Sequence, residues 1–155
     1  MKYEEIAERY TVVVYRAALN YCKNKNDAED AVQNAFMKML QSKVEFQDEE
    51  HIKRWLIRVV INECKNMWNS FWRKKVSSLE ELDYEIETFS ENEKELFEEV
   101  MKLPAKYSIV LHLYYYEEYS VREIAGLLYI SESNVQTRLM RGRNKLKQQL
   151  QEAWA

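Results

Sequence analysis

The chain has 155 residues, of which 46% are hydrophobic and 32% are charged, with two glycines and one proline. Hairpins and strand turns depend on glycine and proline, so this composition argues against a β-rich fold and predicts an all-α protein. Cys22, Cys64 and the two histidines lack the close spacings of a zinc site or a disulfide framework. We therefore expect no metal and no cofactor, and we interpret both thiols as buried apolar groups.

Two further classes of protein are disfavoured by the sequence. It contains neither a run of apolar residues long enough to cross a membrane nor a secretory leader, which predicts a cytoplasmic protein without membrane insertion. It also lacks a nucleophile paired with a base, a metal cluster and a phosphate-binding loop. We therefore expect no enzyme activity.

Charge is distributed unevenly along the chain, whose net charge is −3. Residues 1–75 hold 14 basic and 11 acidic residues, residues 76–98 hold 1 and 9, and residues 99–155 hold 8 and 6. Two basic blocks around an acidic connector indicate two modules joined by a linker. We predict domains at 1–75 and 91–155, separated by an acidic linker at 76–90.

Two helices are expected at the start of the chain, over Tyr3–Lys23 and Asp27–Gln41, because apolar residues recur at helical spacing. Asp27, Glu29 and Asp30 crowd the first turn of the second helix, where the helix dipole stabilises each negative charge by about 0.3–1 kcal/mol. A polar strip then follows, formed by Gln33, Asn34 and Lys38. This strip is suited equally to water and to a partner.

A third, long helix is expected from about Glu49 to Trp72 or Arg73, after a polar connector that contains Phe46. Its polar face carries Arg58, Asn62, Lys65, Asn66, Asn69, Trp72 and Arg73. From residue 51 to residue 75 there are seven basic residues and a single acid, Glu63. Cations, amides and aromatic rings on one face suit a phosphate backbone with unpaired bases, although an ordinary solvated face fits equally well.

The second module is expected to begin with two helices, over Glu91–Leu103 and from Pro104 to about Glu118. The three consecutive tyrosines, Tyr114 to Tyr116, cannot all point inward, so at least one ring should lie at the surface. The residues before this module, 76–90, are acidic and indicate an extended or partly helical linker.

A helix-turn-helix is predicted near the C-terminus. Ser120 and Glu123 have the spacing of a capping box for a short helix, and Ser131 or Ser133 can cap a second helix that follows after a turn. Ala125 and Val135 have the small or apolar character expected where the two helices meet.

The polar face of the last helix is rich in hydrogen-bond donors. It carries Asn134, Gln136, Thr137, Arg138, Arg141, Arg143, Lys145 and Lys147. Residues 120–150 hold six basic residues against two acids, a pattern typical of a nucleic-acid-binding helix. The alternative is a solvated helix end whose cations favour the C-terminal dipole.

Taken together, these segments resemble a bacterial RNA polymerase sigma factor of the extracytoplasmic-function (ECF) group, which is sigma-70-like and has two promoter-binding domains. The matching segments, in the family order, are DAEDAVQNAFMKML (27–40), WLIRVVINECKN (55–66), LPAKYSIVLHLYYYEEYSVREIA (103–125) and ISESNVQTRLMRGRNKLK (130–147). The resemblance implies an all-α chain with a region 2-like domain and a region 4-like helix-turn-helix domain.

The resemblance also implies partners and site residues. Contacts with the clamp helices of the largest subunit of core RNA polymerase would come from Asp30, Gln33, Asn34 and Leu40; many relatives have Glu where this chain has Asn34. The minus-10 element would be melted and bound by Ser42, Phe46, Asn62, Lys65 and Asn66. The minus-35 element would be bound by Ser131, Ser133, Gln136, Thr137, Arg138 and Arg141. The polymerase flap and an anti-sigma factor are further implied partners, and the acidic linker would pass near the RNA exit path.

Two other functions are considered beside the promoter-specificity subunit. A free-standing helix-turn-helix regulator would bind duplex DNA alone, typically as a dimer. The sequence has no heptad run that would form a dimer seam, which disfavours this reading. An interaction protein whose basic faces bind acidic partners is the third and weakest alternative.

Overall fold

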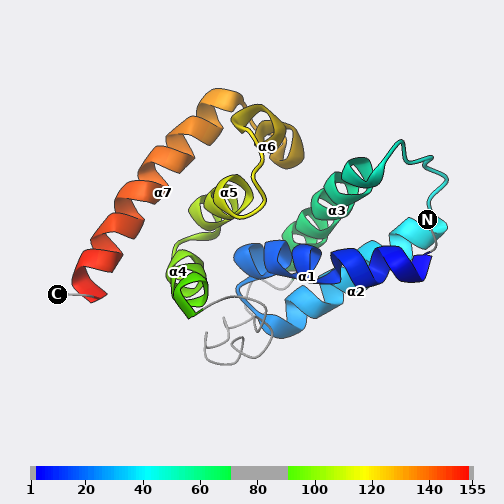
Figure 1. Cartoon of the computed structure of the whole chain (residues 1–155), viewed down its shortest axis with the longest axis horizontal. Helices are drawn as coiled ribbons and strands as arrows, with labels where there is room; N and C mark the ends of the chain where they lie inside the picture. Colours follow the sequence, from blue (N-terminus) through cyan, green and yellow to red (C-terminus); the bar gives the residue numbers. More distant parts are fainter. Residues whose placement is uncertain (1–2, 71–90, 154–155) are drawn as a thin grey trace. The chain divides into compact units, whose positions relative to one another are not determined.

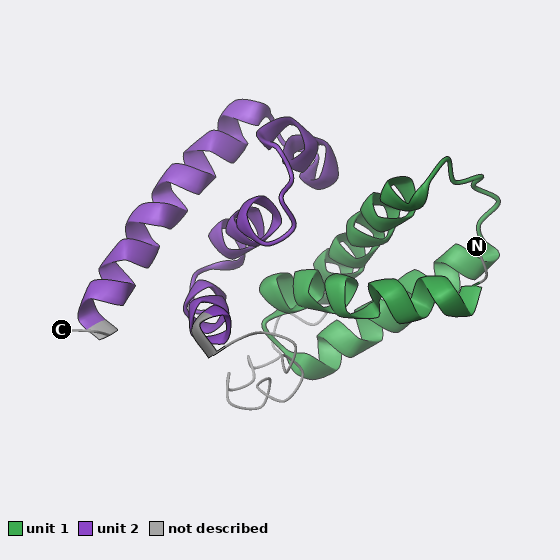
Figure 2. Cartoon of the chain, in the orientation of Figure 1, with its two compact units in different colours: residues 1–76 green, residues 77–155 purple. Residues whose placement is uncertain are grey.

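The computed structural model describes residues 3–70 and 91–153 (Figure 1). Within these ranges the chain forms seven helices and no strand, which confirms the prediction of an all-α protein. The helices are α1 (Tyr3–Cys22), α2 (Lys25–Gln41), α3 (Glu49–Ser70), α4 (Glu91–Met101), α5 (Ala105–Tyr115), α6 (Val121–Leu128) and α7 (Glu132–Ala153). The chain divides into two compact units, unit 1 (residues 1–76) and unit 2 (residues 77–155) (Figure 2).

Unit 1 is a three-helix bundle in which α1, α2 and α3 each pack against the other two. Small side chains let the helices approach closely, and the alanines with no exposed surface are Ala17, Ala18, Ala28, Ala31 and Ala35. Larger fully buried side chains from α3 fill the remaining volume, among them Leu56, Ile57 and Ile61. The two thiols, Cys22 and Cys64, are both buried in this core, as predicted.

Lys23 and Asn24 set the end of α1 and the start of α2. Lys23 has a φ of 58°, in the left-handed region, and this ends α1 at Cys22. Asn24 then caps α2, because its side chain accepts a hydrogen bond from the Asp27 N–H at 3.0 Å. The second helix therefore begins at Lys25, two residues earlier than predicted, and of the three crowded acids only Asp27 lies in its first turn.

Unit 2 is built around α5, which packs against α4, α6 and α7. Its fully buried core side chains include Phe97, Ile109, Leu111, Leu113, Ile124 and Leu139. Helix α7 passes close over α5 at Gly142, where a Cβ atom would lie 3.2 Å from Leu111 Cδ1 and 3.3 Å from Tyr107 Cβ. Glycine is therefore what allows this close crossing.

Several details of unit 2 differ from the predictions. Helix α4 ends at Met101, and α5 ends at Tyr115. Residue Glu118, where α5 was expected to end, instead has a left-handed φ of 59°. Leu96 of α4 is 40% exposed, whereas Phe97 and Val100 of the same helix are buried. Tyr115 is 53% exposed, which confirms that at least one of the three tyrosine rings lies at the surface.

Candidate nucleic-acid and polymerase interfaces

Helices α6 and α7 form the predicted helix-turn-helix, and each has a well-defined start. The Ser120 hydroxyl accepts from the Glu123 N–H at 3.1 Å, and the Glu123 carboxylate accepts from the Ser120 N–H at 3.0 Å, which completes the capping box. For α7, the capping residue is Ser131, whose hydroxyl accepts from the Asn134 N–H at 3.0 Å. The turn between the helices is closed by Tyr129, which adopts a left-handed conformation with a φ of 56°.

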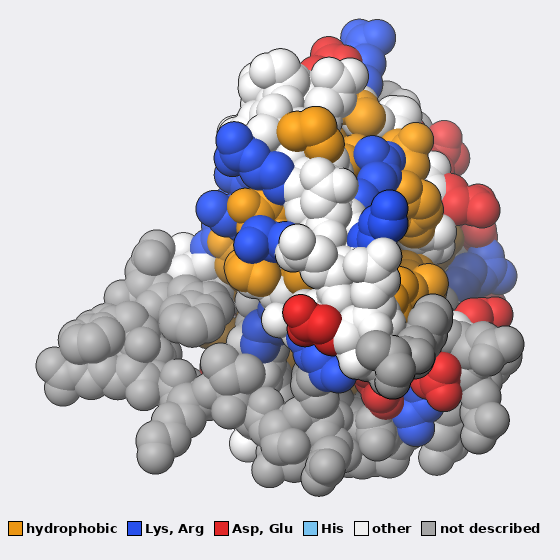
Figure 3. Space-filling model, turned by 90° about the vertical axis from the view of Figure 1, so that its left-hand side faces the viewer, with side chains coloured by type: hydrophobic (Ala, Val, Ile, Leu, Met, Phe, Trp, Pro, Cys, Tyr) orange, Lys and Arg blue, Asp and Glu red, His pale blue; other side chains and the backbone are white. Residues whose placement is uncertain are grey.

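The first turns of α7 present polar groups to solvent. Ser131, Ser133, Gln136 and Arg141 are exposed, whereas Thr137 and Arg138 are half-buried. The Arg138 Nε donates to the Asn134 Oδ1 at 3.1 Å, which holds the guanidinium along the helix surface. Lys and Arg side chains lie over the side of the molecule that α7 occupies, with hydrophobic side chains exposed between them (Figure 3). This face offers donors of the kind that contact phosphates and base edges.

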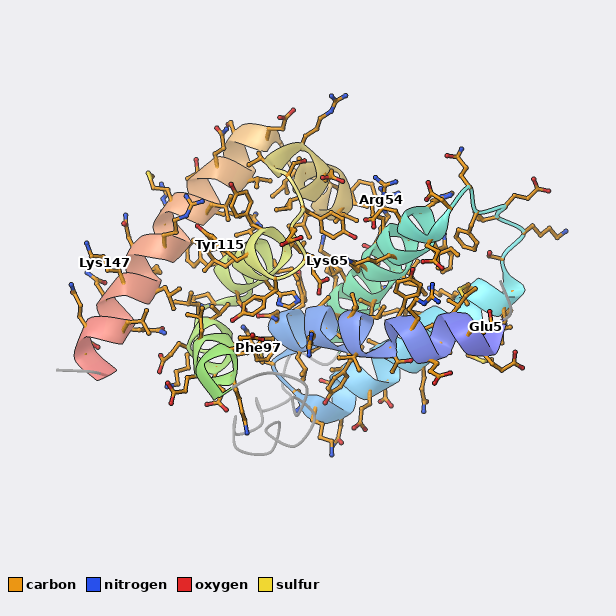
Figure 4. The ribbon with its side chains drawn as sticks, in the orientation of Figure 1. Glu5, Arg54, Lys65, Phe97, Tyr115 and Lys147 are labelled. Carbon is orange, nitrogen blue, oxygen red and sulfur yellow. The ribbon has the colours of Figure 1, made fainter. Side chains whose placement is uncertain are left out.

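Arg143 differs from the other basic residues of α7 because it turns toward α5. Its Nε donates to the Tyr115 hydroxyl at 2.5 Å, and its guanidinium lies 5.5 and 5.6 Å from the ring centroids of Tyr115 and Tyr114. Tyr115 points from α5 toward α7 (Figure 4). Arg143 therefore links α7 to α5, a contact that its place on the predicted polar face of the last helix did not indicate.

A groove in unit 2 was not predicted from the sequence. It has a volume of about 670 Å³ and is lined by Leu96, Leu111, Tyr115, Arg143, Leu146, Lys147, Leu150 and Gln151. Its floor is apolar and its rim carries two cations. The available signal was an excess of leucines on the last helix, since Leu146 and Leu150 continue its apolar stripe past the end of the core.

In unit 1 the residues predicted to contact polymerase lie on the outer side of α2. Asp30, Gln33, Asn34 and Leu40 are all exposed, and Leu40 is 56% exposed. Sequence reasoning missed Met37, which is 52% exposed on the same helix and adds a second large apolar side chain. An exposed strip that mixes an acid, amides and apolar groups is suited to a protein partner.

Asn34 also makes a contact within unit 1. Its Nδ2 donates to the Glu63 Oε2 on α3 at 3.3 Å, and the same carboxylate forms an ion pair with Lys38 of α2. Glu63 is 9% exposed, so the single acid of the basic stretch lies against α2. The sequence placed Asn34 and Lys38 on a polar strip but gave no indication of this pairing.

The residues predicted to bind the minus-10 element fall into two groups. Ser42 ends α2, and Phe46, in the following loop, packs edge-on against His51 and Trp55 with ring centroids 5.2 and 5.7 Å apart. Asn62, Lys65 and Asn66 lie farther along α3. Seven residues separate Trp55 from Asn62, which corresponds to about 10 Å along a helix axis. The loop group thus meets α3 at Trp55, about two turns before the group on the helix itself.

Part of the polar face predicted for the third helix lies beyond the residues that the structure describes. Residues Trp72 and Arg73, and the whole acidic linker at 76–90, lie outside the described residues. On the polar side of α3, Lys65 is labelled in Figure 4. Arg58 and Asn66 are exposed and Asn62 is half-buried, so cations and amides do line this side.

Two buried groups of unit 1 have shifted pKa values. Burial lowers the pKa of the Lys23 ammonium to about 7. A hydrogen bond with Cys22, together with burial, raises the pKa of the Cys64 thiol, which therefore stays protonated. Within residues 3–70 and 91–153, His, Cys, Asp and Glu nowhere cluster in a way that would hold a metal ion. None of the helices described here is long and apolar enough to cross a membrane.

Comparison with known proteins gives matches for both units. Residues 6–74 match Sigma-70 region 2, and residues 93–146 match Sigma-70 region 4. The chain is 30% identical over 158 residues to the ECF RNA polymerase sigma factor SigM of Bacillus subtilis, with 95% of this chain and 94% of SigM covered. It is 29% identical over 142 residues to the RNA polymerase sigma factor SigV of the same organism, with 88% and 83% covered.

Two solved structures share the fold. One is the sigma factor RpoE in complex with the anti-sigma factor NepR from Bartonella quintana, with a TM-score of 0.67, 17% identity, and coverage of 96% of this chain and 98% of that chain. The other is CnrH in complex with the cytosolic domain of CnrY, with a TM-score of 0.67, 21% identity, and coverage of 97% and 88%. With both regions matched in order over most of its length, the chain belongs to the sigma-70 family, as an ECF-type RNA polymerase sigma factor.

Proposed function

We propose that this chain is a promoter-specificity subunit that binds core RNA polymerase and directs initiation by recognising minus-35 and minus-10 elements and melting DNA. The observation that carries the proposal is the exposed donor face of α7 behind a capped turn, with Gln136 and Arg141 open to solvent. This face belongs in the major groove of the minus-35 element. Catalysis then resides in the core polymerase, and the chain works in the cytoplasm as a non-catalytic subunit.

Unit 1 serves the minus-10 element in this proposal. Asn62, Lys65 and Asn66 bind the unpaired non-template strand, and Phe46 and Ser42 help to hold a flipped-out base. The aromatic cluster of Phe46 with Trp55 supports this role, because it forms a platform at one end of the same helix. Base–aromatic stacking is worth about 1–3 kcal/mol per base, enough to offset much of the cost of unpairing.

Two surfaces are available for protein partners. The exposed strip of α2, with Asp30, Gln33, Asn34 and Leu40, docks on the clamp helices of the largest polymerase subunit in our proposal. The groove of unit 2 takes an apolar segment of the polymerase flap. The acidic segment at 76–90 joins the two DNA-binding domains, 1–75 and 91–155. An anti-sigma factor is a further expected partner, because the similar sigma factor RpoE was solved in complex with the anti-sigma factor NepR.

Run-off transcription tests the proposal. Purified core polymerase is given a library of promoters, with and without this protein, and the products are sequenced. The proposal requires initiation that depends on the protein and selects two spaced motifs. Absence of stimulation, together with tight binding of the protein alone to duplex DNA, would instead identify a free-standing helix-turn-helix regulator.

A further inference from the structure

Helix α3, which the proposed function assigns to DNA binding, carries a single acid within its basic stretch. Glu63 is the one acidic residue between residues 51 and 75, where seven basic residues lie. It directly follows Asn62 and lies two residues before Lys65, both of which the proposed function assigns to DNA. A free carboxylate here would repel the phosphates of a bound strand.

The contacts of Glu63 compensate this negative charge. Its side chain is 12% exposed and lies against α2, where it is ion-paired with Lys38. Asn34, one turn earlier on α2, donates to the Glu63 Oε2 at 3.3 Å. The carboxylate therefore receives one cation and one amide from the neighbouring helix, and its charge is compensated away from the polar side of α3.

Helix α2 contributes both groups, although neither lies on the DNA-binding helix. The Lys38 side chain is 55% exposed, so the ion pair forms at the edge of the α2–α3 contact. With Lys38 removed, the Glu63 carboxylate would lose its cation and keep only the Asn34 amide as a partner. A poorly solvated carboxylate without a cation either turns toward solvent or stays as uncompensated charge beside Asn62 and Lys65.

We propose that Lys38 and Asn34 are positioning residues of α2 that act on DNA binding by α3 through Glu63. They hold the carboxylate against α2 and compensate its charge, so that the polar side of α3 meets the phosphates without an opposing acid. This inference rests on the proposed function. It adds that the helix assigned to polymerase docking also sets the electrostatics of the DNA-binding helix.

A double-mutant cycle tests the inference. Lys38→Gln, Glu63→Gln and the double variant are each assembled into holoenzyme with core polymerase. The probe is a single-stranded non-template oligonucleotide carrying the minus-10 sequence that wild-type protein selects in the run-off assay. Affinity is measured by fluorescence anisotropy, and the melting temperature of each free variant is recorded. Lys25→Gln is the matched control, because Lys25 lies on the same helix but pairs with Glu29 within α2, at 3.7 Å.

The expected change in DNA affinity on replacing Lys38 depends on whether Glu63 is present. Lys38→Gln should weaken DNA binding about two- to fivefold, the size of one unscreened charge at about 10 Å. In the Glu63→Gln background the same substitution should have a clearly smaller effect, because only the lysine's own charge is lost there, and Glu63→Gln alone should bind DNA at least as tightly as wild type. Lys25→Gln should bind as wild type does.

A merely structural role would give a different pattern. If Lys38 and Glu63 served only the stability of unit 1, DNA affinity would follow the melting temperature, and Glu63→Gln would weaken binding; that result overturns the inference. An equal loss for Lys38→Gln in both backgrounds would also overturn it, because Lys38 would then act on DNA through its own charge and not through Glu63. If wild-type holoenzyme selects no promoter, the proposed function fails and this inference fails with it, a result seen before any variant is made.

Discussion

Arg143 and Tyr115 are joined across two helices of unit 2, with the Arg143 Nε donating to the Tyr115 hydroxyl at 2.5 Å. Two residues earlier on the same helix, Arg141 is exposed. Arg143 is exposed as well, but it also contacts α5, and the spacing of two residues places the two arginines on different sides of α7. Arg141 and Arg143 thus carry the same charge in different surroundings, and they make a matched pair for mutation.

Arg141→Ala is expected to reduce transcription that depends on the minus-35 element by about tenfold or more, since one good contact to a base edge contributes about 1–3 kcal/mol of discrimination. Binding to core polymerase should stay as in wild type. Run-off yields from templates with and without the minus-35 element, beside a competition assay for core, measure the two effects. An equal loss of core binding would mean that α7 has been misassigned.

Arg143→Ala removes the same charge and should act on stability. Loss of one hydrogen bond and two cation–π contacts is expected to cost about 1–2 kcal/mol and lower the melting temperature. The ratio of yields with and without the minus-35 element should hardly change. A drop in that ratio as large as the one for Arg141→Ala would mean that Arg143 contacts DNA as well.

Asp30→Arg is expected to impair binding to core polymerase with little effect on folding. Asp30 is exposed, and α2 begins at Lys25, so the helix dipole of the first turn does not account for this acid. Competition for core against wild-type protein measures the effect, and circular dichroism checks the fold. The control is Glu29→Arg, on the same helix and paired with Lys25. Undiminished competition by Asp30→Arg would remove Asp30 from the docking surface.

Leu96→Asp tests the groove of unit 2. Leu96 lines the groove and is 40% exposed, so a charge there should leave the fold intact and disfavour an apolar occupant. We expect minus-35-dependent transcription to fall about tenfold, because unit 2 would no longer be held by the flap. Val12→Asp is the matched control, since Val12 is 38% exposed on α1. Equal yields from the two variants would show that the groove has no part in initiation.

Lys23 predicts a pH dependence of stability. It is 8% exposed, and burial lowers its pKa from 10.5 to about 7. Between these values the unfolded chain binds more protons than the folded chain, so this residue makes stability rise with pH across that window. Below the lower value both states are protonated, and the folded state bears the full cost of the buried ammonium.

Lys23→Met should remove this dependence. The gain in unfolding free energy over wild type should be on the order of a few kcal/mol at pH 7 and should shrink as the pH approaches 10. Urea unfolding at several pH values measures it, with Lys43→Met at an exposed position as control. A gain that stays constant with pH would show that Lys23 is not neutralised by burial.

Local signals in the sequence predict most of the fold. The capping box at Ser120 and the apolar spacing of each helix depend on residues a few positions apart, and these elements are confirmed. Helix ends were less predictable, because Lys23, Glu118 and Tyr129 adopt left-handed conformations that glycine or asparagine usually signals. Tertiary packing imposes these conformations, so the local sequence does not reveal them.

The candidate sites were predicted as residue types on helix faces, and the structure adds their partners. Asn34 with Glu63 and Arg143 with Tyr115 are separated by 29 and 28 residues in the chain. Helical periodicity describes one helix at a time, so it could not reveal contacts between helices. The groove was missed for the same reason, since its walls come from three helices.

Gly142 divides α7 into two halves with different surroundings. At this residue the helix passes close over α5, and its N-terminal half extends about 15 Å beyond Gly142, at 1.5 Å per residue. The C-terminal half, with Leu146 and Leu150, walls the groove. One helix therefore carries both the wall of the groove and the exposed donors of its first turns, so a larger side chain at residue 142, which would press on Leu111 and Tyr107 of α5, would disturb both surfaces together.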